Sequence, residues 1–339
     1  MENHLQYFKV SNFKCFEHLE LNDLGKFNFI VGDNNVGKTS LLEALLFDDM
    51  DNDKDFNNFQ NRLKYVLYHI RKLQNVNSYF LDYFVNRRNE NWQSLITVNF
   101  QVKDNKGERH TIFEYHNKNN LKIEIYEKHN KVLSNENASM VNNVYDTLLP
   151  YVHQHLAYGD DLTAYYAKHL QTSQKQKKQF IDSLKTLIPH LTNLETSEII
   201  DKKNALILYQ DDIDASLPLA TFGEGAIKLF RVLMEIIVWK NQRLMIDEID
   251  NGLHHARLSD YLQTVLQTAD TQNTQLFATT HNLECLQKLQ TLLEKPENKH
   301  LQEKVRIIRL AHTKKQGITA YTYNYDKFEY AIENDLELR

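Results

Sequence analysis

Gly32-Asp33-Asn34-Asn35-Val36-Gly37-Lys38-Thr39, followed by Ser40, is the stretch that decides the fold of this chain. It matches the pattern G-x-x-x-x-G-K-[ST] in full. The glycines let backbone N–H groups curl around phosphate groups, which the N-terminus of a following helix also attracts. Lys38 is predicted to reach the β- and γ-phosphates of a nucleotide, and the hydroxyl of Thr39 is predicted to coordinate Mg²⁺.

The residues around this loop supply the strand and the helix that the motif requires. Short strands are predicted at Tyr7–Val10, Phe16–Leu21 and Phe27–Val31, separated by turn-like segments at Ser11-Asn12 and Asn22–Gly25. The third strand runs into the loop, and leucines at helical spacing follow it: Leu41, Leu42, Leu45 and Leu46. This strand–loop–helix order favours a phosphate-binding loop over a chance glycine turn.

An apolar strand that ends in two acids forms the second motif, Leu244-Met245-Ile246-Asp247-Glu248. A carboxylate at a strand end beside the phosphate loop suits the Mg²⁺ shell, and we assign this role to Asp247. The adjacent Glu248 can act as the general base for an attacking water molecule. Acid pairs at strand ends are common, so the interpretation depends on the loop upstream.

Two further motifs lie beside predicted elements of the C-terminal third. The predicted strand Gln275–Ala278 is followed by Thr279-Thr280-His281-Asn282, and His281 is the candidate for a γ-phosphate sensor. Thr221-Phe222-Gly223-Glu224-Gly225 precedes a long predicted helix, whose N-terminus suits a phosphate group. An ordinary helix-capping turn is the alternative interpretation of the glycine-rich segment.

The rest of the chain shows both helical and strand patterns. Apolar residues from Phe56 to Leu73 repeat at helical spacing, and residues from about 138 to 200 also have helical patterning. Strands are predicted elsewhere, at Leu95–Val102, Thr111–Tyr115, Leu121–Tyr126, Ala205–Tyr209, Arg243–Ile246, Val305–Leu310 and Thr319–Tyr325, with a turn at Asp104–Gly107. Strand–helix alternation in the C-terminal third indicates a parallel sheet covered on both faces.

Composition restricts the class of protein further. The 339 residues carry a net charge of −5, which argues against nucleic-acid binding over the whole surface. Lysines at 168, 175, 177, 178 and 185 form the densest basic run, which a solvated helix face explains more often than a DNA contact. We expect a cytoplasmic protein with no membrane segment and with reduced thiols at Cys15 and Cys285. The histidine pairs match no zinc pattern.

Along the chain, the phosphate loop comes first, followed by the glycine-rich helix start, the acid pair and His281. Motifs in this order resemble those of ABC-type ATPases of the RecF/SMC-like class. More closely, the chain is similar to the small AAA-family ATPases of the overcoming-lysogenisation type found in bacterial anti-phage defence systems. The likeness covers both ends of the chain well and the middle poorly. The segments that carry it are Val10–Phe16, Gly32–Ser40, Gly223–Lys228, Met245–His254, Phe277–Asn282 and Phe328–Arg339.

The resemblance implies an α/β fold, a P-loop NTPase with an ABC-type ATPase head. This fold has a mixed or parallel sheet, an antiparallel β subdomain and helical insertions. The implied divisions are an N-terminal ATPase part with the P-loop (1–47), a helical insertion (48–91), the β subdomain (92–127), a helical region (128–200) and a C-terminal ATPase part (201–339).

The resemblance also implies a nucleotide site that uses ATP and Mg²⁺ and is shared between two subunits. Gly223, Glu224 and Gly225 would bind the nucleotide of the opposite subunit, so that two ATP molecules are held in a head-to-tail dimer. The implied assembly is this homodimer or a higher assembly built on such dimers. In the family that the chain resembles, the glycine-rich segment corresponds to the signature motif, which reads LSGGQ in transporters. Phe222 and Glu224 depart from that transporter pattern but suit the RecF-like branch. Asp250 matches a loop that crosses the dimer interface, and Lys14 matches a position near the nucleotide. Gln154 and Gln171 both remain candidates for the Q-loop glutamine.

Three functions are compatible with these residues. The first is the sensor or regulatory ATPase of an anti-phage or toxin system that acts with a separate effector protein. The second is a DNA-repair or DNA-end-binding ATPase, which would require a basic groove on the dimer. The third is an ATP-switched scaffold with negligible hydrolysis, against which the presence of Glu248 and His281 weighs.

Overall fold

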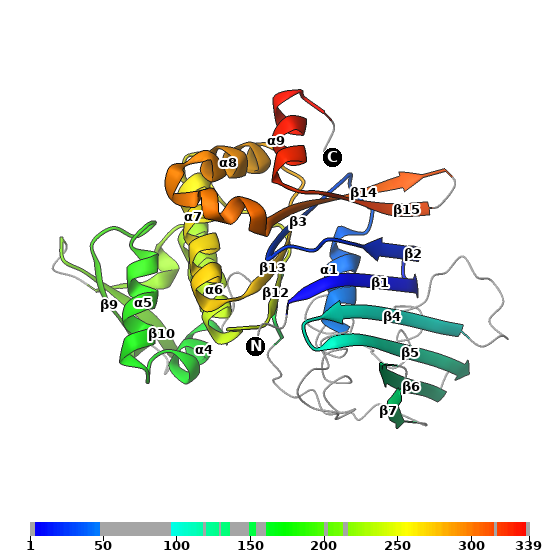
Figure 1. Cartoon of the computed structure of the whole chain (residues 1–339). Coiled ribbons are helices and arrows are strands. Elements are labelled where there is room, and N and C mark those ends of the chain that lie inside the picture. Colours follow the sequence, from blue (N-terminus) through cyan, green and yellow to red (C-terminus); the bar gives the residue numbers. More distant parts are fainter. Residues whose placement is uncertain are drawn as a thin grey trace. The chain divides into compact units, whose positions relative to one another are not determined.

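The computed structural model describes residues 4–47, 96–117, 120–128, 130–135, 149–153, 161–199, 203–212, 216–314 and 317–336 (Figure 1). They form two compact units, each built from segments that are distant in sequence. Unit 1 comprises Met1–Tyr151, Phe277–His281 and Glu303–Arg339, and unit 2 comprises Val152–Leu276 and Asn282–Gln302. The helical insertion predicted at 48–91 lies outside the described residues.

An antiparallel sheet in unit 1 has the strand order β2-β1-β4-β5-β6-β7. Its core is aromatic, since the ring of Phe100 makes edge contacts with Phe13 at 5.6 Å and with Phe113 at 5.5 Å between centroids. The strands predicted here are confirmed, and β7 is an additional one. The bounds are β1 Leu5–Phe13, β2 Phe16–Leu21, β4 Ile96–Asp104, β5 Gly107–Asn117, β6 Asn120–Glu127 and β7 Asn130–Asn135.

The turns of this sheet agree with the sequence at one position and differ at another. The turn expected between Asp104 and Gly107 joins β4 to β5. The turn expected at Ser11-Asn12 is wrong, because β1 continues to Phe13. Register with β4 carries Ser11 within the sheet, opposite Asn99, and the reversal occurs at Lys14, whose φ is 49°.

A second group of strands in unit 1 leads into the phosphate loop. Here β3 (Phe27–Val31) pairs in parallel with β14 (Val305–Thr313), and β14 pairs antiparallel with β15 (Gly317–Tyr323). On its other side, β3 neighbours β13 (Gln275–Thr279), whose last three residues belong to unit 1. All five residues of β3 are buried, as expected for a strand covered on both faces.

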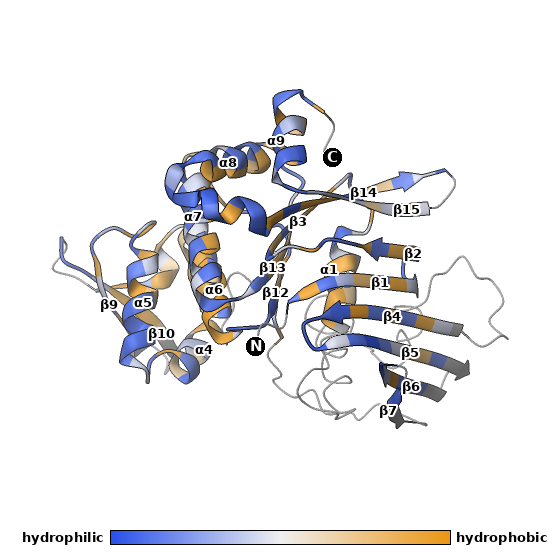
Figure 2. Cartoon of the chain, viewed as in Figure 1, coloured by the Kyte–Doolittle hydropathy of each residue, from blue (hydrophilic) through white to orange (hydrophobic). Residues whose placement is uncertain are grey.

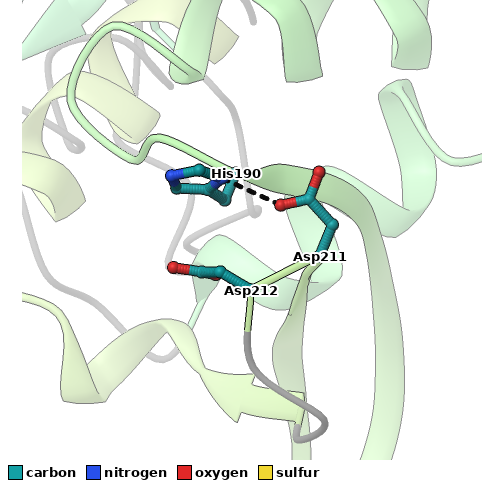
Figure 3. Close-up of side chains that lie close together, drawn as sticks. All are labelled: His190, Asp211 and Asp212. Carbon is teal, nitrogen blue, oxygen red and sulfur yellow. Dashed lines mark hydrogen bonds and ion pairs between the residues drawn. The ribbon is translucent and has the colours of Figure 1, made fainter.

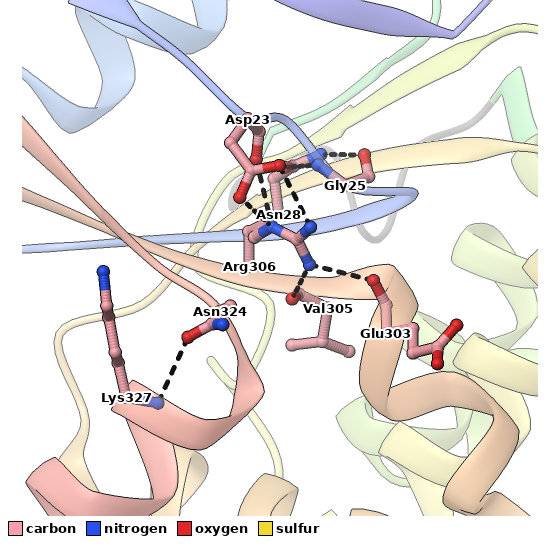
Figure 4. Close-up of polar contacts among 8 residues, drawn as sticks. All are labelled: Asp23, Gly25, Asn28, Glu303, Val305, Arg306, Asn324 and Lys327. Atoms are coloured by element: carbon pink, nitrogen blue, oxygen red, sulfur yellow. Dashed lines mark hydrogen bonds and ion pairs between the residues drawn. The ribbon is translucent and has the colours of Figure 1, made fainter.

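Arg306 ties the turn before β3 to the first residues of β14 (Figure 4). Its guanidinium donates to both carboxylate oxygens of Asp23, at 2.9 and 3.1 Å, and to the backbone oxygens of Glu303 and Val305, each at 2.9 Å. This bidentate contact joins residues that are 283 positions apart. The contact stabilises the parallel pairing of β3 with β14, and this pairing fixes the end of β3 where the phosphate loop begins.

A helix follows the last strand of the chain, where the sequence pattern predicted no further element. Helix α9 covers Tyr325–Glu333, so Tyr325, expected at the end of a strand, is the first residue of this helix. The side chain of Asn324 caps it by accepting a hydrogen bond from the N–H of Lys327 at 3.2 Å (Figure 4). The cap ends the strand early because it fixes the backbone at the helix start.

The helices of unit 2 include α6 (Glu224–Val238), α7 (His255–Gln272) and α8 (Leu283–Glu294). Strand β12 (Arg243–Ile246) is buried along its whole length, and it ends at the acid pair as predicted. Both hydrophobic and hydrophilic residues occur on α8 (Figure 2), as is typical of a helix that covers a core. Helix α6 is instead buried at every residue from Ile227 to Ile237. None of the described helices is long and apolar enough to cross a membrane.

Two shorter helices and a three-stranded sheet complete unit 2. The helices are α4 (Asp161–His169) and α5 (Gln174–Leu184), and aromatic contacts link them to α6: the rings of Phe180 and Phe230 lie 4.9 Å apart. The sheet has the order β11-β10-β9, with β9 at Leu191–Ile199, β10 at Lys203–Gln210 and β11 at Ser216–Pro218.

The helical pattern predicted for residues 138–200 is therefore wrong at its C-terminal end. Leu191 and Leu194 are both buried, and their spacing of three imitates a helix. In β9 an irregularity of register produces the same spacing, because Asn193 pairs with Tyr209 whereas Leu191 pairs with Gln210. The extra residue in between lets both leucines face the core.

Candidate nucleotide site

The phosphate loop of unit 1 has the backbone that its glycines predict. Gly32 and Gly37 have φ values of 141° and 93°, which L side chains rarely adopt. A Cβ at Gly32 would lie 2.3 Å from the backbone oxygen of Leu310, and one at Gly37 would lie 2.6 Å from Sγ of Cys15. Val36 is buried, whereas Asp33, Asn34 and Asn35 are exposed at the tip of the loop.

Helix α1 (Lys38–Phe47) starts directly at the functional residues of the motif. Its first three residues, Lys38, Thr39 and Ser40, are half-buried. The ammonium of Lys38 donates to the backbone oxygens of Gly32 at 2.7 Å and Asp33 at 2.8 Å. The side chain of Lys38 therefore bonds back to the first two residues of the loop that precedes it.

Lys14, expected near the nucleotide, lies close to the same helix. Its ammonium pairs with the carboxylate of Glu43, which is fully buried in α1. The ammonium also lies 5.5 Å from the ring centroid of Phe13. Lys14 is thus joined to the helix that carries Lys38 and Thr39, and its contact with a nucleotide stays a prediction.

The sensor candidate His281 follows β13 and belongs to unit 1 with the phosphate loop. The N–H of the preceding residue, Thr280, donates to the backbone oxygen of Ile30 at 3.1 Å. Ile30 lies in β3, two residues before Gly32. His281 is exposed. The end of β13 thus lies beside the strand that leads into the loop, and the role of His281 as a γ-phosphate sensor stays a prediction.

The acid pair lies in unit 2, at the end of β12. Asp247 is buried, and its N–H donates at 2.8 Å to the backbone oxygen of Val152, the last residue of β8 (Tyr151–Val152). Glu248 is half-buried and has a φ of 50°. A glutamate in the left-handed region is uncommon, and such residues are concentrated at functional sites.

The glycine-rich segment, also in unit 2, forms the start of α6. Gly223 is the N-cap residue, no side chain caps the helix, and Gly223 and Glu224 are exposed. A Cβ at Gly223 would meet no atom within 4 Å, whereas one at Gly225 would lie 2.9 Å from Cδ2 of Leu253. Gly225 is therefore explained by packing, and Gly223 leaves an open approach to the positive end of the helix.

Lys228 lies in the segment Gly223–Lys228, but the sequence motifs assigned it no role. It is 3% exposed, and its ammonium donates to the backbone oxygens of Glu248 at 2.5 Å and Asn251 at 2.8 Å. Burial lowers the pKa of Lys228 to about 8, and the nearby carboxylates of Asp250, Glu248 and Asp247 oppose this shift. The sequence held a signal for a special role of such residues, because charged residues at 228, 231 and 235 interrupt an otherwise apolar segment.

Within each unit, the structure brings candidates together in two groups. The phosphate loop, Lys14 and His281 belong to unit 1, and the acid pair, Asp250 and the segment Gly223–Gly225 belong to unit 2. Of the Q-loop candidates, Gln154 lies outside the described residues. Gln171 accepts a hydrogen bond from the hydroxyl of Thr196 at 2.9 Å.

One other group of possible metal ligands occurs among the described residues. His190, Asp211 and Asp212 lie close together in unit 2, and Nδ1 of His190 lies 2.9 Å from a carboxylate oxygen of Asp211 (Figure 3). All three side chains are exposed. An exposed histidine–aspartate pair is common without a metal, and we assign no role to it.

The donor set fits the ligands that the motifs imply. Mg²⁺ prefers oxygen ligands, and each unit offers one such candidate: the hydroxyl of Thr39 in unit 1 and the carboxylate of Asp247 in unit 2. A nucleotide phosphate prefers backbone N–H groups and a lysine, which the loop from Gly32 to Lys38 supplies. A Cβ at Gly32 or Gly37 would collide with neighbouring atoms, so this curled loop requires both glycines.

The chain matches a known protein family and a curated relative over most of its length. Residues 27–286 match the family AAA_21, described as "AAA domain, putative AbiEii toxin, Type IV TA system". A protein of Helicobacter pylori described as an ATP/GTP phosphatase is 24% identical over 378 residues, covering 98% of this chain and 99% of its own.

Solved structures with a similar fold include the heads of SMC proteins. An SMC head bound to the C-terminal winged-helix domain of ScpA has a TM-score of 0.58 and 11% identity, covering 96% of this chain and 98% of its own. The SMC head of Thermotoga maritima has a TM-score of 0.51 and 12% identity, covering 95% and 98%. These likenesses establish an α/β fold of the ABC-type ATPase head, as the sequence predicted.

Proposed function

The chain belongs to the AAA_21 family and is an ATPase, and from this premise we propose that two copies of it hold two ATP molecules in a head-to-tail dimer. The observation that carries the proposal is the exposed start of α6, where no side chain caps Gly223 and an added Cβ would meet no atom. A helix N-terminus with this open approach can accept a phosphate group from outside the subunit.

Within one subunit, the side chains divide the work of hydrolysis. The loop from Gly32 to Gly37 binds the phosphates through its N–H groups, and Lys38 stabilises charge on the β- and γ-phosphates. Thr39 and Asp247 would hold Mg²⁺, which when bound neutralises phosphate charge. Glu248 accepts a proton from the attacking water, and His281 donates a hydrogen bond to the γ-phosphate. The water oxygen forms its bond to the γ-phosphorus as the bond to the bridging oxygen breaks.

The partner subunit completes the site in this proposal. Gly223, Glu224 and Gly225 of one copy bind the γ-phosphate of the nucleotide held by the other copy. Asp250 lies three residues after Asp247, in the loop that we propose crosses the interface. Lys14 contributes positive charge near the nucleotide, in contact with the helix that carries Lys38.

In the cell, we infer a sensor or regulatory ATPase of a bacterial anti-phage or toxin system that acts with a separate effector protein. The family description, which refers to a toxin of a type IV toxin–antitoxin system, supports this role. Two of the SMC heads with the same fold were solved bound to a domain of ScpA, so this fold can carry a protein partner. Binding of DNA that weakens as salt rises would instead favour a DNA-repair ATPase.

The proposal is tested by measuring ATP turnover and molar mass in solution, with and without Mg·ATP, for wild type, Lys38→Ala and Glu248→Gln. We expect turnover by wild type and none by Lys38→Ala. We expect Glu248→Gln to double its mass with Mg·ATP, because ATP stays intact between the subunits. Turnover without any ATP-dependent gain in mass would overturn the dimer, and a mass gain without turnover would favour the scaffold.

A further inference from the structure

Lys228 connects the glycine-rich start of α6 with the loop that carries the candidate general base. It is the fifth residue of α6, and its buried ammonium donates to the backbone oxygens of Glu248 and Asn251, at 2.5 and 2.8 Å. An ammonium has three donors, so these two bonds occupy most of its capacity. A buried lysine is costly unless its charge is compensated, which makes a mere space-filling role unfavourable.

The loop held by Lys228 is a tight turn with a strained first residue. The N–H of Asn251 donates to the backbone oxygen of Glu248 at 3.0 Å, so this oxygen accepts bonds from both the turn and Lys228. Glu248 has a φ of 50°, in the left-handed region. A non-glycine residue keeps this conformation where its surroundings determine it, and Lys228 bonds to both ends of the turn.

Two other contacts join the same pair of segments. A Cβ at Gly225 would lie 2.9 Å from Cδ2 of Leu253, and one at Gly252 would lie 3.4 Å from Oε2 of Glu224. The segments 224–228 and 248–253 of unit 2 are therefore in contact at both ends, through Glu224 and Gly225 at one end and Lys228 at the other. A displacement at the start of α6 would act on the backbone of Glu248.

We propose that Lys228 is a positioning residue for ATP hydrolysis, which holds the backbone of Glu248 in its left-handed conformation and ties the start of α6 to the catalytic loop. The inference rests on the proposed function, in which Glu248 activates water and Gly223–Gly225 bind the nucleotide of the partner. Lys228 contacts backbone oxygens, and it acts on the reaction through Glu248. Its loss therefore slows hydrolysis without weakening nucleotide binding by the phosphate loop.

The test replaces Lys228 by Met, which keeps an unbranched chain and removes the ammonium, and by Gln, a shorter neutral donor. Lys240→Met removes an exposed lysine two residues after α6 and serves as the matched control. We expect Lys228→Met to lower kcat at least tenfold, with KM and the Kd of a fluorescent ATP analogue within about twofold of wild type. The kcat of Lys228→Gln should lie between those of wild type and Lys228→Met. The kcat of Lys240→Met should equal that of wild type.

A double-variant cycle separates positioning from general support of the fold. Single-turnover rates are measured for Lys228→Met in the wild-type and in the Glu248→Gln background. If Lys228 acts through Glu248, Lys228→Met lowers the single-turnover rate of the wild-type background but hardly lowers that of the Glu248→Gln background. An equal loss in both backgrounds, or a kcat within twofold of wild type, overturns the inference. Wild-type turnover that Lys38→Ala abolishes would still uphold the proposed function in that case.

Discussion

The ammonium of Lys38 donates a hydrogen bond of 2.7 Å to the backbone oxygen of Gly32, the first residue of the phosphate loop. A second bond, of 2.8 Å, goes to the backbone oxygen of Asp33. Lys38, the first residue of α1, thus bonds back to the beginning of the motif, six residues earlier in the chain. These two bonds hold the positive charge of Lys38 at the phosphate loop. A phosphate bound in the loop would share this ammonium with the two backbone oxygens.

Replacing Lys38 by Ala should raise the Kd for Mg·ATP by about 10- to 100-fold, because a charge-assisted hydrogen bond contributes about 1.5–3 kcal/mol. Turnover should fall below detection, since the γ-phosphate loses its positive neighbour. The measurement is titration with a fluorescent ATP analogue beside a phosphate-release assay. Lys175→Ala, at an exposed lysine of α5, is the control and should behave as wild type. Unchanged affinity in Lys38→Ala would remove the phosphate loop from the site.

Replacing Gly223 by Trp should block the dimer without harming the subunit. No atom lies within 4 Å of an added Cβ at this exposed residue, so we expect the free energy of unfolding to change by less than about 0.5 kcal/mol. In the Glu248→Gln background, the mass gained with Mg·ATP should disappear, as measured by light scattering. Ser197→Trp, at an exposed residue of β9, should keep the gain. A Gly223→Trp protein that still dimerises would contradict the role of this segment in trans.

Arg231 and Glu235 form a buried ion pair in α6, 2.9 Å apart and each about 1% exposed. The carboxylate also accepts bonds from the hydroxyl of Tyr165 at 2.8 Å and from Nε1 of Trp239 at 2.9 Å. Burial raises the pKa of Glu235, against the effect of Arg231. Arg231→Met should therefore lower the free energy of unfolding by about 3–5 kcal/mol, because it leaves a buried carboxylate without its counter-charge.

Urea unfolding followed by tryptophan fluorescence measures this loss. The double variant Arg231→Met with Glu235→Leu removes both charges and should recover most of the stability. If the double variant is no more stable than Arg231→Met alone, the pair is not the source of the loss.

Glu124 in β6 makes the stability of unit 1 depend on pH. The ammonium of Lys131, at 2.5 Å, with further bonds from Lys122 and Tyr126, lowers the pKa of Glu124 from 4.5 to about 2. Because the folded pKa lies below the unfolded one, the stabilisation is present above pH 4.5 and is lost as pH falls from 4.5 to 2.

The comparison of Glu124→Gln with wild type checks this sign. The variant should have a lower urea midpoint at pH 7, and the difference should shrink as the pH is lowered below 4.5. Glu127→Gln, at an exposed residue of the same strand, is the control. A difference that stays constant between pH 7 and pH 3 would mean that Glu124 does not titrate with a lowered pKa.

Much of the fold could be predicted from local sequence. The bounds of Phe16–Leu21, Phe27–Val31 and Arg243–Ile246 agree with the sequence prediction to the residue, because these strand-like segments end at asparagine, glycine and aspartate, respectively. The helix after the phosphate loop follows from leucine spacing. Where the pattern was ambiguous the prediction failed, as in β9, whose bulge gives a strand the spacing of a helix.

The sequence by itself determined the chemistry of this protein, because the motif at Gly32–Ser40 needs only its own residue types and the elements that flank it. Tertiary structure alone decided how the candidate base is held. Lys228 and Glu248 are 20 residues apart, and their contact depends on the packing of α6 against the end of β12. The spacing of apolar residues along the chain cannot predict a hydrogen bond from a side chain to the backbone oxygen of a residue distant in sequence. The left-handed backbone of Glu248 likewise arises from the contacts that surround it.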